Sequence, residues 1–216
     1  MSKIKNIKAK EIKDSRGNPT IEIKLETDKG KFFASIPSGA SKGKHEALEL
    51  RDEDGKGVKK AIKNINKIIT PKLKDLNPEN QAEIDKIMID MDGTENKSKL
   101  GANAILAVSM AVCRAGAGSK KIPLYRHIAE LCEAGLQTKL GIPLAMFNIL
   151  EGGKHADNEL DIQEFMIVPQ KDTFAENLIL CNKIFNNLKE NIEKNYDNIE
   201  MGDEGGFAPK IFKTEQ

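Results

Sequence analysis

The strongest constraint on the fold is a double change in hydrophobic periodicity along the chain. Residues 4–36 alternate between apolar and polar side chains, as at Ile21 and Ile23, and this two-residue period is typical of strands with one buried face. From about Gly57 the apolar residues recur at three- and four-residue steps, which indicates helices. Past Leu140, short apolar runs typical of buried strands return. The chain is therefore expected to form two different arrangements in succession.

The first part is predicted to be a small antiparallel sheet followed by a cluster of helices. Three strands are expected within residues 4–36, and a turn at residues 28–30 precedes the third. The expected helices lie at residues 58–69, from the capping pair Asn77-Pro78 to Gly93, at residues 100–117, and from Pro123 to about Gly135. A sheet followed by helices defines an α+β domain, which we place at residues 1–140.

Residues 141–216 are predicted to begin a second domain of another class. Apolar runs at 143–150 and 162–168 indicate buried strands, and a capping box of Thr173 and Glu176 opens an amphipathic helix. Two strands and a helix resemble the opening of a barrel or a large sheet. A closed (β/α)₈ barrel takes about 250 residues, so we expect only its first, incomplete part here.

Charge and composition exclude several classes of partner. Lysines and arginines number 34 and aspartates and glutamates 33, so no net field draws the chain to nucleic acid or to an acidic membrane. No segment approaches the roughly 18 apolar residues of a membrane span, and the charged start lacks the apolar run of a secretory signal. Cys113, Cys132 and Cys181 lie in helical patterns that suit reduced thiols. We expect a cytoplasmic protein that acts on small molecules.

The loop at residues 37–45 combines small residues, hydroxyls, glycines and lysines. Ser38 and Ser41 supply hydroxyls, and Lys42 and Lys44 supply positive charge. Such a loop could close over a phosphate or give a hydroxyl ligand to a metal, because glycines permit motion. The alternative is a flexible link between the sheet and the helices, and the spacing is not that of a P-loop.

Polar residues beside the two later strands are candidates for a second site. His155 follows the first strand next to two glycines, where it could bind a phosphate or shuttle a proton, or be an exposed bystander. Gln163 and Glu164 lie inside an otherwise apolar run, where burying an unpaired carboxylate costs several kcal/mol. Glu164 is therefore expected to have a partner cation, a metal or a reaction, with a structural salt bridge as the alternative.

Asp203 and Glu204 form a carboxylate pair framed by glycines on both sides. Glycine allows backbone angles that other residues avoid, so the pair can be presented on a sharp bend, although a surface turn has the same composition. If Glu164 and Glu204 converge in one pocket, one of them could act as a proton donor. Together these segments indicate acid/base work on an anionic metabolite, with a divalent cation.

Six segments resemble the enolase family, the phosphopyruvate hydratases of glycolysis. In order along the chain they are DSRGNPT (14–20), SGAS (38–41), HEALELRD (45–52), LGANAIL (100–106), DIQEFM (161–166) and GDEGGFAP (202–209). The resemblance covers essentially this whole chain but only about the first half of an enolase. It implies an α+β cap followed by the opening of an enolase-type barrel.

The resemblance also implies a reaction and roles for individual residues. The family interconverts 2-phosphoglycerate with phosphoenolpyruvate and water, using two magnesium ions and a lysine base. Glu204 matches the family's acid, which assists departure of the C3 hydroxyl, and Glu164 matches its partner carboxylate near the same group of the substrate. Gln163 and His155 match residues that contact the substrate. Ser41 matches the mobile-loop serine that ligates the second magnesium.

Further matches and departures complete the comparison with the family. Arg16 matches an arginine near the dimer contact, so a complete version is expected to be a homodimer. Glu151 stands where the family usually has asparagine, and Lys42 where threonine is more usual; either charge could alter loop closure or substrate affinity. The resemblance places the catalytic lysine and the ligands of the first magnesium outside these 216 residues, so the chain alone is expected to be inactive.

Two hypotheses from different classes follow. In the first, the chain is the amino-terminal part of an enolase, and activity belongs to the barrel completed by a carboxy-terminal chain or segment. In the second, it is a non-catalytic binding or interaction module that keeps the enolase cap. Thr214 resembles a helix cap with its helix just begun, which favours the first hypothesis.

Overall fold

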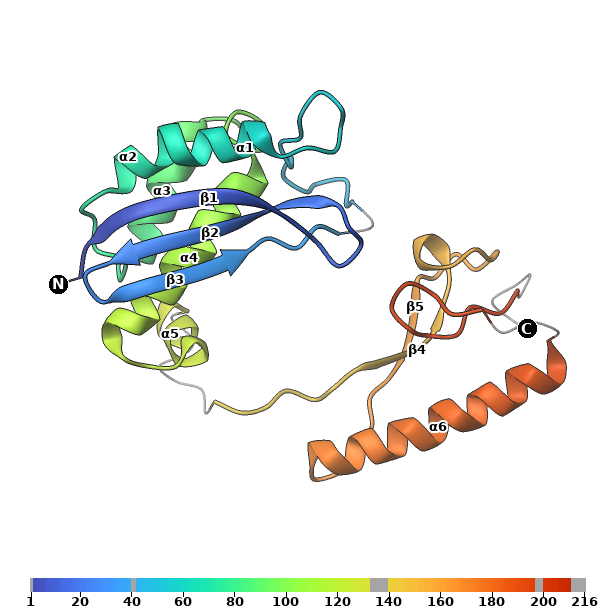
Figure 1. Cartoon of the computed structure of the whole chain (residues 1–216). Coiled ribbons are helices and arrows are strands. Elements are labelled where there is room, and N and C mark those ends of the chain that lie inside the picture. The colour runs from blue at the N-terminus through green and yellow to red at the C-terminus, as the bar shows by residue number, and fades with distance from the viewer. Residues whose placement is uncertain (1, 40–41, 133–139, 197–199, 211–216) are drawn as a thin grey trace. The chain divides into compact units, whose positions relative to one another are not determined.

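The structure, a computed structural model, describes residues 2–39, 42–132, 140–196 and 200–210. Its contacts divide the chain into two compact units, Met1–Lys139 and Leu140–Gln216, which are described separately below (Figure 1). The helix expected to begin at Thr214 lies outside the described residues.

The first unit opens with a three-stranded antiparallel sheet in the order β1-β2-β3. The strands are β1 (Ile4–Lys13), β2 (Pro19–Thr27) and β3 (Gly30–Ser35). Alternation places Ile21, Ile23 and the other apolar residues of β2 on one fully buried face. The opposite face carries the ion pairs Lys10–Glu22 and Lys24–Glu26. The predicted meander is confirmed, and it has the one-sided polarity of an antiparallel sheet with one wet face.

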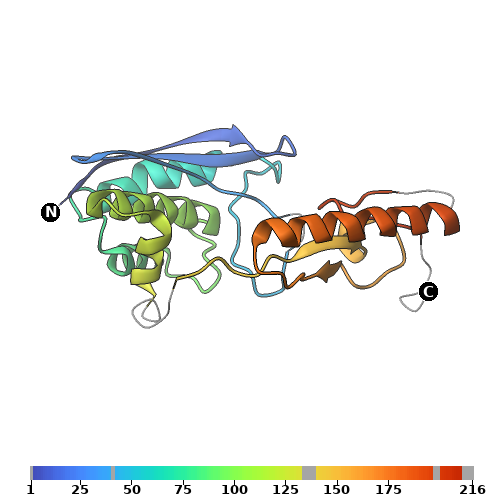
Figure 2. The same ribbon diagram turned by 90° about the horizontal axis from the view of Figure 1, so that it is seen from below.

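Helices cover the apolar face of this sheet (Figure 2). They are α1 (Lys59–Asn64), the π-helical turn η1 (Ile65–Ile69), α2 (Thr70–Leu73), α3 (Gln81–Asp92), α4 (Ala102–Lys120) and α5 (Leu124–Leu131). Helix α4 is buried on most sides, as its apolar sequence predicts, and a Cβ at Gly118 would lie 2.3 Å from the ring of Phe32 on β3. None of the helices in the described ranges is both long and apolar enough to cross a membrane.

Two predicted helix boundaries are wrong. Asn77 and Pro78 do not open α3, which begins three to four residues later at Gln81. The Asn77 side chain accepts the N–H of Glu79 and its carbonyl accepts the N–H of Asn80, so these residues close a separate turn before the helix. Helix α5 ends at Leu131, where the following residue, Cys132, turns to extended backbone. The remainder of the expected helix falls in residues 133–139, outside the described ranges.

Asp92, at the end of α3, organises the connection to α4. Its side chain is 2% exposed and accepts the N–H of Leu100 at 2.6 Å, the N–H of Thr94 at 3.0 Å and the Thr94 hydroxyl. Burial disfavours the charged carboxylate, but these hydrogen bonds outweigh it, and the pKa of Asp92 lies below its usual value. The carboxylate therefore stabilises a loop that has little apolar packing of its own.

His127, on α5, is fully buried in the first unit. Both ring nitrogens lack a hydrogen-bond partner within the described structure, and a Cβ at Gly116 would lie 2.6 Å from Nε2. Burial, reinforced by Lys120, lowers the pKa of this imidazole below its usual value, against the weaker opposite effects of Glu130 and Glu79. His127 is thus held in its neutral form by an apolar environment.

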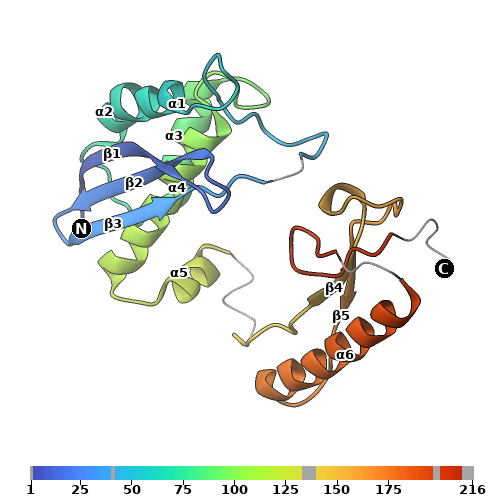
Figure 3. The same cartoon turned by 45° about the vertical axis from the view of Figure 1, so that its right-hand side comes forward.

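The second unit contains two short strands and a long helix. They are β4 (Phe147–Glu151), the 3₁₀ turn η3 (Gly153–His155), β5 (Glu164–Ile167) and α6 (Phe174–Asn195). The strands pair antiparallel, and Phe207 extends the sheet by a parallel bridge to Leu150. Helix α6 runs beside the strands (Figure 3), and the ring of Phe185 stacks on Phe207 with centroids 4.3 Å apart. Both strands are shorter than the apolar runs that predict them.

The amino terminus of α6 agrees with its sequence signature. The Thr173 hydroxyl accepts the N–H of Glu176, and the Glu176 carboxylate accepts the N–H of Thr173. The capping box is therefore confirmed, and it satisfies two backbone donors that the first turn leaves without helical partners.

Candidate active site

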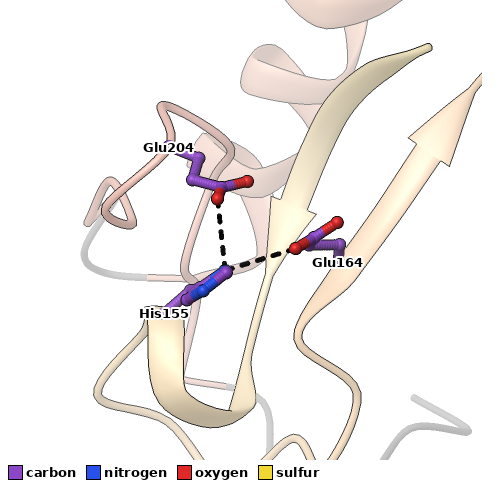
Figure 4. Close-up of side chains that lie close together, drawn as sticks. All are labelled: His155, Glu164 and Glu204. Carbon is purple, nitrogen blue, oxygen red and sulfur yellow. Dashed lines mark ion pairs between the residues drawn. The ribbon is translucent and has the colours of Figure 1, made fainter. Parts of the chain in front are cut away.

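Three ionisable side chains converge at one end of the β4–β5 pair (Figure 4). His155 ends the η3 turn that follows β4, and Glu164 is the first residue of β5. Because the strands are antiparallel, with Glu151 paired to Glu164, the end of one lies beside the start of the other. Glu204 comes from the glycine-framed segment near the end of the described chain. Three segments distant in sequence therefore supply one cluster.

His155 is the centre of this cluster. Its Nδ1 lies 3.6 Å from Oε1 of Glu164 and 3.8 Å from Oε1 of Glu204. Both separations exceed hydrogen-bonding distance, and Nδ1 is buried without a hydrogen-bond partner. The His155 side chain is 8% exposed, whereas Glu164 is 30% and Glu204 48% exposed. A buried nitrogen thus faces two more accessible carboxylates across a gap that a ligand group can enter.

Neighbouring amides hold the cluster from both sides. Nε2 of Gln163 lies 3.3 Å from Nε2 of His155, and Nδ2 of Asn148 donates to Oε2 of Glu204 at 3.4 Å. Gly153, in the left-handed region at φ 54°, lies against Gln163, where a Cβ would come within 2.9 Å of Cγ. The glycine permits the sharp turn after β4 that brings His155 back toward β5. All four predicted residues of this region, His155, Gln163, Glu164 and Glu204, are therefore close together.

The segment that carries Glu204 is a tight loop with its own hydrogen bonds. Gly202 donates to the carbonyl of Gly206 at 2.9 Å, and Asp203 donates to the carbonyl of His155 at 3.0 Å. Gly205 has φ 88°, which a side chain would strain. The Asp203 side chain is exposed, so of the two carboxylates only Glu204 belongs to the cluster. The glycine framing predicts this bent presentation correctly.

Glu151 is a residue whose position in this region the sequence analysis missed. It is fully buried at the end of β4, and its carboxylate accepts the N–H of Gly206 at 2.5 Å and the N–H of Glu204 at 3.1 Å. Burial of a carboxylate was expected at Glu164, which is instead partly exposed. The available signal was a charged residue at the end of an apolar strand, which the periodicity alone could not connect to a loop fifty residues away.

The serine-containing loop of the first unit is described only in part. Ser41, the predicted metal ligand, lies outside the described residues together with residue 40. At the start of the loop, the Ser38 carbonyl accepts from the Arg16 guanidinium at 2.6 Å. The Ser38 hydroxyl lies 3.3 Å from Glu49, which forms a 2.8 Å ion pair with Arg51. These contacts anchor one end of the loop to the sheet.

The donor set of the cluster decides what it can hold. The ligand atoms of His155, Glu164 and Glu204 lie within 4.8 Å of one another. Magnesium prefers an all-oxygen octahedral environment, and an imidazole nitrogen does not suit it. The cluster fits proton transfer and polar contact with a substrate better than it fits magnesium.

A histidine between two carboxylates, placed where the first strands of an α/β unit end, defines an acid/base site of the barrel class. A family model described as enolase, N-terminal domain, matches residues 4–128, and one described as enolase, C-terminal TIM barrel domain, matches residues 139–216. The enolase of Mastigamoeba balamuthi is 53% identical over 219 residues. The chain therefore belongs to the enolase family.

The coverage of these matches defines what the chain contains. The similarity extends over 98% of this chain but 49% of the Mastigamoeba balamuthi enolase, so the chain spans about half the length of that relative. The predicted fold, an amino-terminal α+β domain followed by part of a TIM-type barrel, is confirmed. The resemblance of the six sequence segments to enolases is confirmed as well.

Proposed function

We propose that the chain contributes the acid half of a phosphopyruvate hydratase site, which converts 2-phospho-D-glycerate into phosphoenolpyruvate and water once the barrel is complete. The observation that carries this proposal is the convergence of His155, Glu164 and Glu204, with Gln163 beside them. Family membership supports the reaction, and the cluster supplies side chains of the kinds that it requires.

The proposed steps follow from the positions of these side chains. Glu204 donates its proton to the C3 hydroxyl, the bond between C3 and that oxygen breaks, and water leaves. Glu164, on the opposite side of His155, contacts the same hydroxyl and orients it for departure. The unpartnered Nδ1 of His155 and the amide of Gln163 bind polar groups of the substrate. The proton at C2 is removed by a lysine that the family supplies outside these 216 residues.

Two magnesium ions are part of the proposal for the complete enzyme. When bound, they would stabilise the carboxylate charge that develops after proton removal. Ser41 is the proposed ligand of the second ion, and the donor set of the described cluster is not one that magnesium prefers. The steps assigned above therefore belong to Glu204, Glu164, His155 and Gln163 alone.

The organisation and setting of the protein are proposed on the same basis. We place the capping domain at residues 1–140 and the start of the barrel at 141–216. The complete enzyme is a homodimer with Arg16 near the subunit contact, and it acts in the cytoplasm in glycolysis. Its partners are 2-phosphoglycerate and phosphoenolpyruvate, not nucleic acid.

Complementation tests the proposed reaction. The 216-residue chain is assayed with 2-phosphoglycerate and magnesium, alone and together with the carboxy-terminal half of the Mastigamoeba balamuthi enolase. We expect phosphoenolpyruvate to form only when both halves are present. Turnover by the purified 216-residue chain alone would contradict the proposed need for the rest of the barrel. Absence of turnover from the folded two-part complex would contradict the proposed reaction.

Substitution of the proposed acid tests its role in the same assay. Glu204→Gln keeps the shape of the side chain but cannot donate a carboxylic proton, and we expect kcat to fall by at least about a hundredfold. Glu159→Gln is the matched control, since Glu159 is an exposed glutamate of the same unit. Unchanged turnover in Glu204→Gln would remove Glu204 from the role of acid.

A further inference from the structure

The buried carboxylate of Glu151 lies directly beneath the loop that carries Glu204. Its two oxygens accept separate backbone donors of that loop, Oε1 from Gly206 at 2.5 Å and Oε2 from Glu204 itself at 3.1 Å. The side chain is fully buried, and no lysine, arginine or histidine in the described ranges forms an ion pair with it. The loop amides are therefore the direct partners of this charge.

The loop is shaped to receive this carboxylate. A Cβ at Gly202 would lie 2.1 Å from Oε2 of Glu151, and a Cβ at Gly206 would lie 2.9 Å from Oε1. Between them Gly205 takes φ 88°, which turns the following N–H inward. Successive backbone N–H groups in such a turn form a concave anion-binding nest. The glycines that frame Glu204 thus make room for the Glu151 side chain as well as bending the backbone.

The main chain of Glu151 is also fixed. Its N–H donates to the carbonyl of Phe207 at 2.8 Å, and its carbonyl accepts the side chain of Asn158 at 2.9 Å. It pairs with Glu164 across the β4–β5 ladder. One residue therefore connects the strand that carries one carboxylate of the cluster to the loop that carries the other.

We propose that Glu151 is a positioning residue, whose buried carboxylate holds the 202–206 loop so that Glu204 faces His155 beside Glu164. Glu151 does not contact the cluster through its own side chain; it acts through the backbone of Glu204. The geometric part of this proposal stands on the hydrogen bonds alone. Its consequence for turnover rests on the proposed function.

The geometric part is tested first on the unsubstituted 216-residue chain, by NMR without substrate and with a chelator present. A hydrogen bond transmits a scalar coupling from the amide nitrogen to the acceptor's carbon. We expect such couplings from the amides of Glu204 and Gly206 to the carboxyl carbon of Glu151. Couplings to another carboxyl group, or their absence while the same experiment detects those of the β4–β5 ladder, would overturn the proposal.

Substitution tests the same contacts independently. In Glu151→Gln the side-chain amide has one acceptor, so at least one loop N–H loses its partner, and we expect roughly ten- to hundredfold faster hydrogen exchange at Glu204 or Gly206. Glu151→Asp retains both acceptor oxygens and should restore part of the protection. Glu159→Gln, an exposed control, should leave both amides unchanged. Equal protection in all three variants would contradict the positioning role.

The catalytic consequence is measured in the complemented enzyme. Glu151→Gln should lower kcat roughly tenfold or more while the KM for 2-phosphoglycerate changes little, because His155 and Gln163 keep their places. A raised KM with unchanged kcat would overturn the role of Glu151 in aligning the acid. If the NMR contacts are present but the complemented enzyme has no activity at all, the proposed function fails and the positioning of the loop stands.

Discussion

Nδ1 of His155 lies 3.8 Å from Oε1 of Glu204, although one follows β4 and the other belongs to a loop near the end of the described chain. No hydrogen bond joins them, and Nδ1 has no other partner. A buried nitrogen left unpaired costs free energy in the unliganded state, so its persistence points to a partner that arrives with the substrate. This relationship gives the first prediction.

His155→Asn should damage function more than stability. In the complemented enzyme we expect kcat/KM for 2-phosphoglycerate to fall by roughly 10²- to 10⁴-fold, because the substrate loses the contact that Nδ1 would make. The melting temperature should change little, since Nδ1 makes no hydrogen bond in the unliganded fold. Steady-state kinetics and thermal unfolding measure the two effects. A large loss of stability at unchanged kcat/KM would make His155 a structural residue.

Gly202→Ala should destabilise the second unit. The new Cβ would lie 2.1 Å from the Glu151 carboxylate, which is buried and held by two backbone donors and so cannot move aside without losing them. We expect a loss of about 1–3 kcal/mol in the free energy of unfolding, measured by urea denaturation followed at this unit.

Gly141→Ala is the control for that substitution. A Cβ at Gly141 meets no atom within 4 Å, and its φ is not in the left-handed region. Its effect should stay within about 0.5 kcal/mol. Equal effects of the two substitutions would show that the Glu151 contact does not restrict position 202.

Asp92→Asn should loosen the connection between α3 and α4. The amide cannot accept all three donors that the carboxylate accepts, so we expect a loss of about 1–3 kcal/mol at neutral pH. Because the folded pKa of Asp92 lies below its unfolded value, its contribution is present above the unfolded pKa and is lost as pH falls through the folded pKa. Urea unfolding at pH 7 and at pH 3 measures this, and the variant should differ less from the parent chain at the lower pH.

His127→Leu should change the pH dependence of stability in the opposite part of the acid range. The folded pKa of His127 lies below its unfolded value of about 6.5, so the unfolded chain binds the proton first. Stability conferred by the neutral imidazole is complete above about pH 6.5 and is lost as pH falls below it. The leucine variant should lack this loss.

The same variant should be more stable than the parent chain at neutral pH. Leucine has a similar size and no nitrogen to leave unpartnered, so a gain of about 1–3 kcal/mol is expected. Unfolding free energies at pH 7.5 and pH 5.5 decide the matter. An identical decline of both proteins over this interval would exclude His127 as its source.

Local sequence patterns predicted most elements because the interactions that form them are local. The alternation in β2, the apolar face of α4 and the Thr173–Glu176 capping box each depend on residues a few positions apart. Boundaries were less accurate where two local interactions compete, as at Asn77, whose side chain closes a turn and leaves the helix to begin at Gln81.

The sequence by itself determined the family, the order of the elements and the identity of the candidate residues His155, Gln163, Glu164 and Glu204. Only the tertiary structure decided that these residues meet, because their meeting depends on the antiparallel register of β4 and β5 and on a loop that folds back against them. It also decided that the buried carboxylate is Glu151 and not Glu164. Burial depends on what packs over a side chain, and here the covering backbone comes from a distant part of the chain.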